Sequence, residues 1–201
     1  MKITVIFPTI TESKYFKRED VELTFCGVGL IASAFGTYKA ILETQPDIII
    51  MGGIAGVYKG VDLEIGDAVI VEREFVADLG LFNSKGFCHI ADDSLDMSFK
   101  VMEYIDCPHI SMQNMFKTAV SNSMNCGLAP FVKTEGVAVE NMEGASFFYV
   151  AKELGVKFLE LRTISNVVDV SHEDWDYETS IKNLANSLNN LIDNLLTIHN
   201  S

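Results

Sequence analysis

The stretch D-I-I-I-M-G-G-I-A-G (47–56) decides the fold class. An apolar run that starts behind Pro46 and leads into closely spaced glycines is typical of a strand buried on both faces. Strands of this kind lie in parallel sheets whose two faces are covered by helices. The run is far shorter than the roughly 20 apolar residues that a membrane-spanning helix needs. It therefore indicates a central strand of an α/β protein.

Segments with strand and helix character alternate on both sides of this run. Alternating, β-branched or extended stretches predict strands at 2–7, 21–26, 67–76, 110–121, 136–140 and 157–165. Apolar residues at helical spacing predict helices at 27–42, 142–154 and 177–196. Residues 81–96 are polar and predict an irregular surface excursion, and residues 97–105 have a weakly helical pattern. The alternation predicts a three-layer α/β/α fold with a central mixed, largely parallel sheet, as one domain over residues 1–201.

The composition excludes several classes of protein. Of 201 residues, 48% are hydrophobic and 21% are charged, with only 4 Pro, which is the composition of neither a disordered nor a collagen-like chain. The 15 Lys and Arg against 28 Asp and Glu give a net charge of −13. Because nucleic acids and anionic membranes select basic surfaces, neither is expected as a partner.

Cysteine usage and the first residues indicate the compartment and the absence of a metal. The cysteines form no C-x-x-C pair, and the apolar part of M-K-I-T-V-I-F-P (1–8) is too short for a signal peptide. A reduced, cytoplasmic protein is therefore expected. Cys88-His89 and Cys107-Pro108-His109 place potential ligands almost side by side, which matches no usual zinc spacing, so no metal is expected.

Polar residues and a group of glycines follow expected strands, where α/β sheets build their sites. They are Glu12 after strand 2–7, the glycines of 52–56 after the central run, Glu143 shortly after strand 136–140, and Asn166 after strand 157–165. Each admits a structural interpretation when taken alone. Glu12 suits a surface turn, Glu143 the first turn of a helix capped by Asn141, and the glycines and the amide suit tight turns.

Taken together, seven features of the sequence resemble one family. They are Glu12, C-G-V-G-L-I-A-S (26–33), G-G-I-A-G (52–56), E-I-G-D-A-V (64–69), F-V-A-D-L-G (75–80), V-E-N-M-E-G-A-S-F-F (139–148) and L-R-T-I-S-N-V-V (161–168). With them the chain resembles the nucleoside phosphorylase/nucleosidase superfamily. Within it, the chain is most similar to the futalosine hydrolases, which are related to the methylthioadenosine/adenosylhomocysteine nucleosidases. The resemblance implies an enzyme without cofactor or metal that acts as a homodimer, with the site near the interface.

The resemblance also implies a role for each matching residue. Glu12 corresponds to the carboxylate that activates water, and Glu143 to the one that accepts hydrogen bonds from the ribose hydroxyls. Carboxylates suit both tasks, because cleavage of an N-ribosidic bond passes through a cationic sugar and a carboxylate can accept two hydrogen bonds. The further substrate-binding positions are Ile54, Ala55, Gly56, Met142 and Ser165.

Asn166 departs from the adenine-cleaving relatives, which carry Asp at this position. An amide offers a donor and an acceptor without charge, so it can donate to a 6-oxo group and accept from N7–H. That pattern matches hypoxanthine or guanine as the leaving base. We therefore expect hydrolysis of a 6-oxopurine nucleoside derivative. The first candidate is futalosine, which is split into hypoxanthine and dehypoxanthine futalosine in menaquinone biosynthesis.

Three other functions stay open from the sequence: a methylthioadenosine/adenosylhomocysteine nucleosidase, a purine nucleoside phosphorylase and a non-catalytic nucleoside-binding homologue. Phosphorolysis needs a phosphate cradle, which arginines usually form. The chain has three arginines, Arg18, Arg73 and Arg162, and the last is expected to support structure. Gly66 stands where phosphorylases of the superfamily tend to place an arginine. Water is therefore the expected nucleophile.

Two further regions are expected near the substrate. Residues 118–127 occupy the stretch that closes over the purine in relatives, and Asn122 and Asn125 are its candidate base contacts. Trp175, behind the acidic stretch 169–174, either flanks the 5′ end of the substrate or anchors the last helix.

Overall fold

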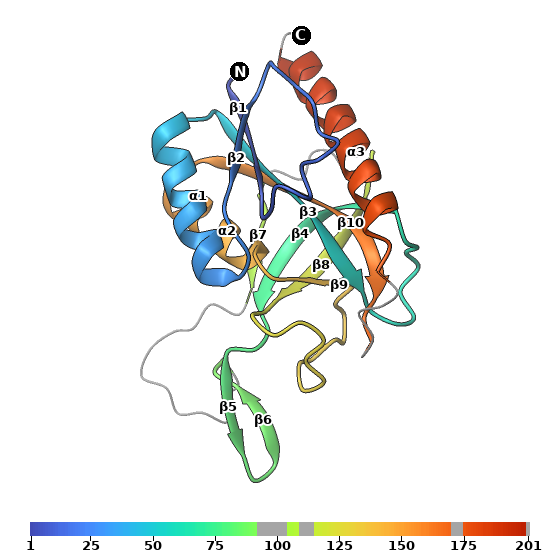
Figure 1. Ribbon diagram of the computed structural model, residues 1–201. Helices are drawn as coiled ribbons and strands as arrows, with labels where there is room; N and C mark the ends of the chain where they lie inside the picture. Colours follow the sequence, from blue (N-terminus) through green and yellow to red (C-terminus); the bar gives the residue numbers. More distant parts are fainter. Residues whose placement is uncertain (92–103, 109–114, 170–174, 200–201) are drawn as a thin grey trace.

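The computed structural model describes residues 1–91, 104–108, 115–169 and 175–199 (Figure 1). Its main sheet consists of β1 (Ile3–Phe7), β2 (Glu22–Phe25), β3 (Ile48–Val57), β4 (Ala68–Val76), β7 (Ile105–Asp106), β8 (Lys117–Ser123), β9 (Val139–Asn141) and β10 (Lys157–Val167). The order is β10-β4-β8-β9-β3-β1-β2, with β7 paired to β4. Among these described strands β10–β4, β9–β3 and β7–β4 pair antiparallel and the other pairs are parallel. The expected mixed, largely parallel sheet is confirmed.

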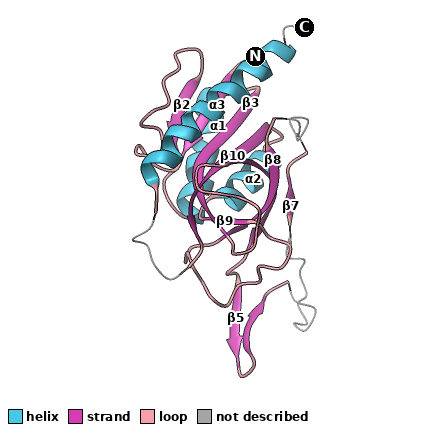
Figure 2. Ribbon diagram, turned by 90° about the vertical axis from the view of Figure 1, so that its right-hand side faces the viewer, coloured by secondary structure: helices cyan, strands magenta, loops and turns pink. Residues whose placement is uncertain are grey.

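The sheet closes on itself through β10. One edge of β10 pairs with β3 in parallel, and the other edge pairs with β4. β8 and β9 complete the ring from β4 back to β3. Figure 2 shows the strands curving around this ring. The sequence predicted the strands but not the closure, which brings the ends of β3, β9 and β10 together.

β3 is longer than the sequence predicted. The expectation that residues 52–56 form a turn behind the strand was wrong, because the strand continues to Val57. The glycines serve close packing instead. A Cβ atom on Gly52 would lie 2.7 Å from Cδ1 of Leu188, and one on Gly53 would lie 2.3 Å from Nη1 of Arg162. A side chain at either position would displace what packs against the strand.

Among the described residues, three helices cover the sheet, as the periodicity predicted. They are α1 (Leu30–Thr44), α2 (Gly144–Glu153) and α3 (Tyr177–His199). Figure 1 shows α1 and α2 together on one side of the sheet and α3 on the other, which confirms the three layers. α2 ends at Glu153, two residues before Gly155, whose φ of +67° only glycine adopts freely. α3 buries Leu184, Leu188 and Leu191 against β3 and β10.

The polar stretch after β4 is more regular than the sequence suggested. β5 (Gly80–Asn83) and β6 (Gly86–His89) form a hairpin that projects from the body of the protein (Figure 1). The irregular excursion expected at 81–96 is therefore wrong for its first part, and residues 92–96 lie outside the described residues. The hairpin has its own ring contacts, because Phe82 and Phe87 both pack against Phe131. Of the weak helix expected at 97–105, only 104 and 105 are described, and Ile105 lies in β7.

In the described part of the chain, no helix is both long enough and apolar enough to cross a membrane. The same residues contain no group of three His, Cys, Asp or Glu side chains that could hold a metal ion. Cys88 and Cys107 are both buried, and His109 lies outside the described residues.

Candidate active site

A cavity of about 330 Å³ lies where the ends of β3, β9 and β10 meet the loop behind β1. Eight of the residues proposed from the sequence line it: Glu12, Ile54, Ala55, Gly56, Met142, Glu143, Ser165 and Asn166. The other lining residues are Pro8, Thr9, Thr11, Val28, Gly127, Leu128, Glu140, Asn141, Trp175 and Tyr177. Residues far apart in the sequence thus converge on one cavity.

Glu12 is held in the turn behind β1 and is only 6% exposed. The Thr9 hydroxyl donates to Oε2 of Glu12 at 2.6 Å, and the amide of Glu12 donates back to Thr9 at 3.2 Å. The amide of Ile54 donates to Oε1 at 3.1 Å. Burial raises the pKa of Glu12 above that of an ordinary glutamate, although these hydrogen bonds and the charge of Arg162 oppose the rise. A buried carboxylate of raised basicity is suited to accept a proton.

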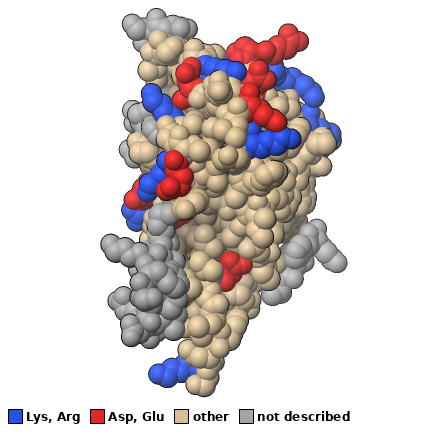
Figure 3. All heavy atoms as spheres, turned by 90° about the vertical axis from the view of Figure 1, so that its left-hand side faces the viewer, with Lys and Arg blue, Asp and Glu red and all other residues tan. Residues whose placement is uncertain are grey.

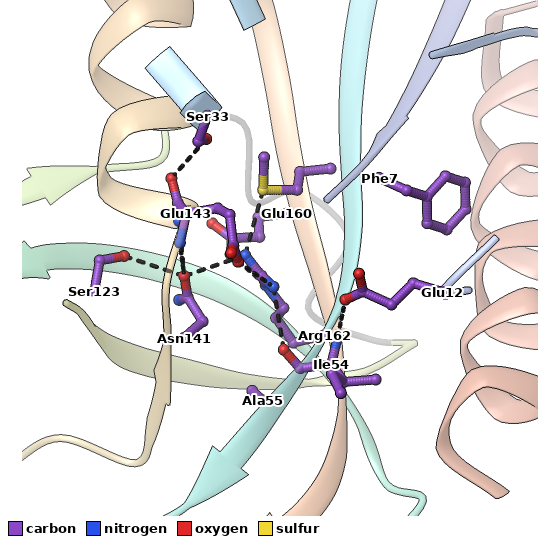
Figure 4. Close-up of polar contacts among 12 residues, drawn as sticks. Phe7, Glu12, Ser33, Ile54, Ala55, Ser123, Asn141, Glu143, Glu160 and Arg162 are labelled. Carbon is purple, nitrogen blue, oxygen red and sulfur yellow. Dashed lines mark hydrogen bonds and ion pairs between the residues drawn. The ribbon is translucent and has the colours of Figure 1, made fainter. Parts of the chain in front are cut away.

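The backbone of Ile54 connects Glu12 to Glu143. Its carbonyl accepts a hydrogen bond from Nη1 of Arg162 at 3.1 Å, and the same Nη1 lies 3.2 Å from Oε2 of Glu143. In Figure 4, Glu12 and Glu143 lie on either side of Ile54 and Arg162. Gly53 leaves the room that the guanidinium occupies, as its close approach to Arg162 requires. The two carboxylates therefore share one rigid support.

Arg162 is 1% exposed and forms part of the wall behind the cavity without lining it. Besides Glu143 and Ile54, it contacts Oε1 of Glu160 through Nε at 2.7 Å and Oδ1 of Asn141 through Nη2 at 3.1 Å. The structural role predicted for Arg162 thus consists of these four contacts. A buried guanidinium compensates the charge that Glu143 brings into the interior.

Glu143 stands at the N-terminus of α2, and Asn141 holds this end of the helix. Oδ1 of Asn141 accepts hydrogen bonds from the amides of Glu143 at 2.8 Å and Gly144 at 2.7 Å. The amide of Gly29, just before α1, lies 3.3 Å from Oε1 of Glu143. Two helix N-termini therefore face this carboxylate, and both favour negative charge.

Asn166 lies inside β10 rather than in a loop after it, because the strand continues to Val167. The pairing with β3 shifts by one residue at Ser165, which is a β-bulge. Bulges turn a side chain out of its regular alternation. Here Oγ of Ser165 reaches Oδ1 of Asn166 at 2.8 Å. A Cβ atom on Gly56 would lie 3.0 Å from Nδ2 of Asn166, so the glycine makes room for the amide.

Asn122 and Asn125 do not line the cavity. Asn122 is fully buried, and its Nδ2 donates to the Tyr58 hydroxyl at 3.1 Å and to the carbonyl of Lys133 at 2.9 Å. Asn125 is exposed and accepts from the amide of Leu30 at 3.2 Å. Both amides therefore fix the loop beside the cavity instead of facing into it.

Sequence reasoning missed Glu140 and Tyr177. It left open whether Trp175 flanks the substrate or anchors the last helix, and Trp175 lines the cavity. Oε1 of Glu140 accepts from the amide of Leu128 at 2.9 Å and Oε2 from the Tyr58 hydroxyl at 3.0 Å, which holds the loop that contains Leu128. Trp175 and Tyr177 pack ring to ring with centroids 5.4 Å apart. Aromatic residues just before a helix carry no signal that distinguishes a wall from an anchor.

The described lining of the cavity contains the carboxylates of Glu12, Glu140 and Glu143 and no Lys, Arg or His. The other two arginines lie elsewhere: Arg18 pairs with Asp20 and Asp193, and Arg73 pairs with Asp106. Gly66, with φ +91°, borders Asn183, and no arginine is near it in the described structure. An anion such as phosphate would find no positive partner on this lining.

The sequence model of the "Phosphorylase superfamily" matches residues 6–198. A futalosine hydrolase of Thermus thermophilus is 27% identical over 184 residues, which cover 83% of this chain and 78% of that protein. A 5′-methylthioadenosine/S-adenosylhomocysteine nucleosidase of Arabidopsis thaliana is 23% identical over 167 residues, which cover 75% of this chain and 58% of that protein.

Solved structures show the same fold. The futalosine hydrolase of Helicobacter pylori strain 26695 superimposes with a TM-score of 0.79 at 19% identity, over 96% of this chain and 98% of that chain. The 5′-methylthioadenosine/S-adenosylhomocysteine nucleosidase of Helicobacter pylori, bound to butyl-thio-DADMe-Immucillin-A, gives the same TM-score, identity and coverage. The match of the superfamily model to nearly the whole sequence shows that this chain belongs to the phosphorylase superfamily.

Proposed function

We propose that the protein is an N-glycosyl hydrolase that cleaves the ribosidic bond of a 6-oxopurine nucleoside derivative, with futalosine as the first candidate. One observation carries the proposal: Glu12, Glu143 and Asn166 line the same cavity, with the two carboxylates joined through Ile54 and Arg162. The names of the Thermus thermophilus and Helicobacter pylori relatives support the reaction class.

Glu12 activates the attacking water. Its carboxylate takes a proton from water as the bond from C1′ of the ribose to the purine breaks, and the hydroxyl is added at C1′. The raised pKa of Glu12 makes it a stronger base than a surface glutamate. Its negative charge also favours the cationic sugar that develops on the way.

Glu143 holds the ribose by accepting hydrogen bonds from the 2′- and 3′-hydroxyls, while Met142 packs against the sugar face. Arg162, Asn141 and two helix N-termini fix the carboxylate before the substrate arrives. A preorganised acceptor needs no rearrangement at the moment of reaction, and this makes such electrostatic support effective.

Asn166 receives the leaving base. Its amide donates to the 6-oxo group through Nδ2. The electron pair of the broken bond stays on the purine, which takes a proton from water at N7, and Oδ1 of Asn166 accepts from the resulting N7–H. The close packing of Gly56 against this amide limits its movement. An adenine would oppose its 6-amino group to a donor and would leave a buried polar pair unsatisfied, which favours the 6-oxopurine.

Water is favoured over phosphate as the nucleophile by the charge of the cavity. Its described lining bears three carboxylates and no cation. A phosphorylase would have to desolvate its phosphate against these carboxylates without an arginine fork, which is costly.

The ring pair of Trp175 and Tyr177 offers an apolar wall to the benzoate ring of futalosine.

The decisive experiment is chromatography of the products that the purified protein forms from futalosine, inosine and methylthioadenosine, with and without phosphate. We expect hypoxanthine from futalosine at a rate independent of phosphate. Adenine from methylthioadenosine would identify an adenine-directed nucleosidase and would contradict the role of Asn166. A rate that requires phosphate would identify a phosphorylase, and binding without any release would identify a nucleoside-binding homologue.

We also propose that two copies of the chain associate through α1. Four apolar side chains on this helix are exposed: Ile31, Phe35, Tyr38 and Leu42. Figure 3 turns this side of the molecule toward the viewer. Few charged side chains lie on it, and most of these gather toward the end of the molecule that carries the termini. Two copies with a net charge of −13 each repel least where they meet at an uncharged face.

The test is the mass in solution by light scattering during size-exclusion chromatography. We expect a dimer, and we expect Phe35→Glu to give a monomer, because it places a charge in the interface. A wild-type monomer at high concentration, or a dimer that persists in Phe35→Glu, would contradict this interface.

A further inference from the structure

Glu74 is a fully buried glutamate of β4 that lies behind the cavity wall without lining it. Nδ2 of Asn141 donates to its Oε1 at 2.6 Å, and its Oε2 lies 2.7 Å from Oγ of Ser123. Ser123 in turn lies 3.2 Å from Oδ1 of Asn141. Glu74, Ser123 and Asn141 therefore close a small ring of polar groups behind the N-terminus of α2.

A second buried carboxyl group faces Glu74 across Gly144. A Cβ atom on Gly144 would lie 2.2 Å from Oε1 of Glu74 and 2.6 Å from both carboxyl oxygens of Glu160. The two groups differ in their partners. Glu160 has the guanidinium of Arg162 at 2.7 Å, whereas the hydrogen bonds of Glu74 among the described residues come from the neutral side chains of Ser123 and Asn141. Two carboxylates this close in the interior cannot both be charged without a large penalty.

The charged groups near the two carboxyl groups favour a proton on Glu74 rather than on Glu160. From β10 it faces Glu160 and Arg162, and the Tyr58 phenol lies close enough to be affected by its charge. Burial, and then the charge of Glu160, raise the pKa of Glu74 to about 8. Arg162 opposes the corresponding rise in the pKa of Glu160.

We propose that Glu74 is a positioning residue that works as a neutral carboxylic acid and fixes Asn141, and through it Glu143, for the reaction. Its Oε2–H donates to Oγ of Ser123, the Ser123 hydroxyl donates to Oδ1 of Asn141, and Oε1 accepts from Nδ2 of Asn141. Oγ of Ser123 also accepts from the amide of Ala145 at 2.8 Å. Oδ1 of Asn141 also accepts from the amides of Glu143 and Gly144 and from Nη2 of Arg162, so the Asn141 amide can take only one orientation.

Loss of the proton undoes this arrangement. The Ser123 hydroxyl turns toward the new carboxylate and leaves Oδ1 of Asn141. Glu74 then carries a negative charge without a cationic partner of its own, beside the carboxylate of Glu160. Because Asn141 holds the amides of Glu143 and Gly144, the ribose-binding carboxylate loses its fixed position. The effect on turnover rests on the proposed role of Glu143 in binding ribose.

The first test is the pH dependence of kcat/KM for wild type, Glu74→Gln, Glu74→Met and the control Glu72→Gln on the same strand. Glutamine keeps the acceptor and the donor of the neutral acid but cannot ionise. We expect Glu74→Gln to stay within about threefold of wild type at pH 6.5, because both hydrogen bonds are retained. We also expect it to lose the alkaline decline that wild type and Glu72→Gln show.

Two results of this test would overturn the proposal. One is a loss of activity in Glu74→Gln at pH 6.5 as large as that in Glu74→Met, since Glu74 would then be needed as an anion. The other is an alkaline decline in Glu74→Gln that matches that of wild type. A role in packing alone would change stability without moving the pH profile.

The second test reads the proton without any substrate, so it holds even if no nucleoside is cleaved and the proposed function fails. A carboxyl group whose pKa is raised in the folded state stabilises least at high pH. Its contribution is fully present below the pKa of the unfolded chain and is lost as the pH rises to the folded pKa. We expect the Tm of wild type to fall relative to Glu74→Gln between pH 5 and pH 8. Equal Tm values at every pH would overturn the proposal.

Discussion

Two of the three carboxylates that line the cavity, Glu12 and Glu143, are the same residue type in contrasting surroundings. Glu12 is held by the Thr9 hydroxyl and one backbone amide, with no cation bonded to it. Glu143 is bonded to Arg162 and faces two helix N-termini. The first environment suits the proton acceptor of the proposed function, and the second suits the proposed ribose-binding carboxylate. The contrast shows how one side chain serves two tasks within one cavity.

The connection between them limits how far the two environments can be changed independently. Arg162 bonds to Glu143 and also lowers the pKa of Glu12 by its charge, while the charge of Glu143 raises it. A change on one side is therefore felt on the other. Substitutions that separate the two effects test whether the division of roles is real.

Removal of the proton acceptor should have the largest effect. Glu12→Gln keeps the shape and the hydrogen bond from Ile54 but cannot take a proton from water. We expect kcat to fall by roughly 10²–10⁴-fold, the usual contribution of a general base. Substrate binding, measured by calorimetry, should be nearly unchanged. Glu19→Gln, an exposed glutamate, is the control, and full activity in Glu12→Gln would remove Glu12 from the mechanism.

Removal of the Arg162 guanidinium should destabilise the surroundings of Glu143. Arg162→Met leaves Glu143 and Glu160 buried without a partner, and loss of one member of a buried ion pair costs about 3–5 kcal/mol of unfolding free energy. Urea unfolding measures this loss. Arg73→Met, which removes an exposed ion pair with Asp106, should change stability little. Equal losses in the two variants would show that the buried network is not special.

A further carboxylate, placed at Asn166, would extend the comparison to the base. Asn166→Asp has Ser165 as its hydrogen-bond partner and no cation. We expect the ratio of kcat/KM for 6-oxopurine to adenine nucleosides to fall by about 10–100-fold, since a polar mismatch costs roughly 1–3 kcal/mol. Parallel assays with inosine and methylthioadenosine measure the ratio, and Asn125→Asp is the control. An unchanged ratio would contradict base recognition by Asn166.

How well the sequence predicted these regions depended on how local their cause is. The apolar run before Gly52, the stop at Gly155 and the apolar stripe of α3 are local signals, and they located β3, α2 and α3. The loop behind β1 with Glu12 was also evident, because it directly follows a strand. What depends on distant neighbours was missed.

The misses share a physical reason. The glycines after Met51 suggest a turn from the sequence, but the strand continues through them. Glycines are needed there because Arg162 and Leu188 occupy the space that side chains would fill. Ring closure through β10 depends on a pairing between strands about a hundred residues apart, for which no local pattern exists. Glu74 ends the charged run E-R-E (72–74), as a surface glutamate would, and only the fold buries it beside Glu160.

The smallest expected effect is also the sharpest test of why the two carboxylates differ. Thr9→Val keeps the volume near Glu12 but removes the hydroxyl that bonds to its charged form at 2.6 Å. Because that bond lowers the pKa of Glu12, its removal should raise this pKa further. The active form is deprotonated, so activity is lost as pH falls through the pKa, and the acid limb of kcat/KM should move to higher pH. Loss of the bond is worth about 1 kcal/mol, a few-fold in rate on that limb. Thr11→Val, at the exposed end of the same turn, should leave the limb in place. A limb that does not move in Thr9→Val would mean that Glu12 is not the group that titrates.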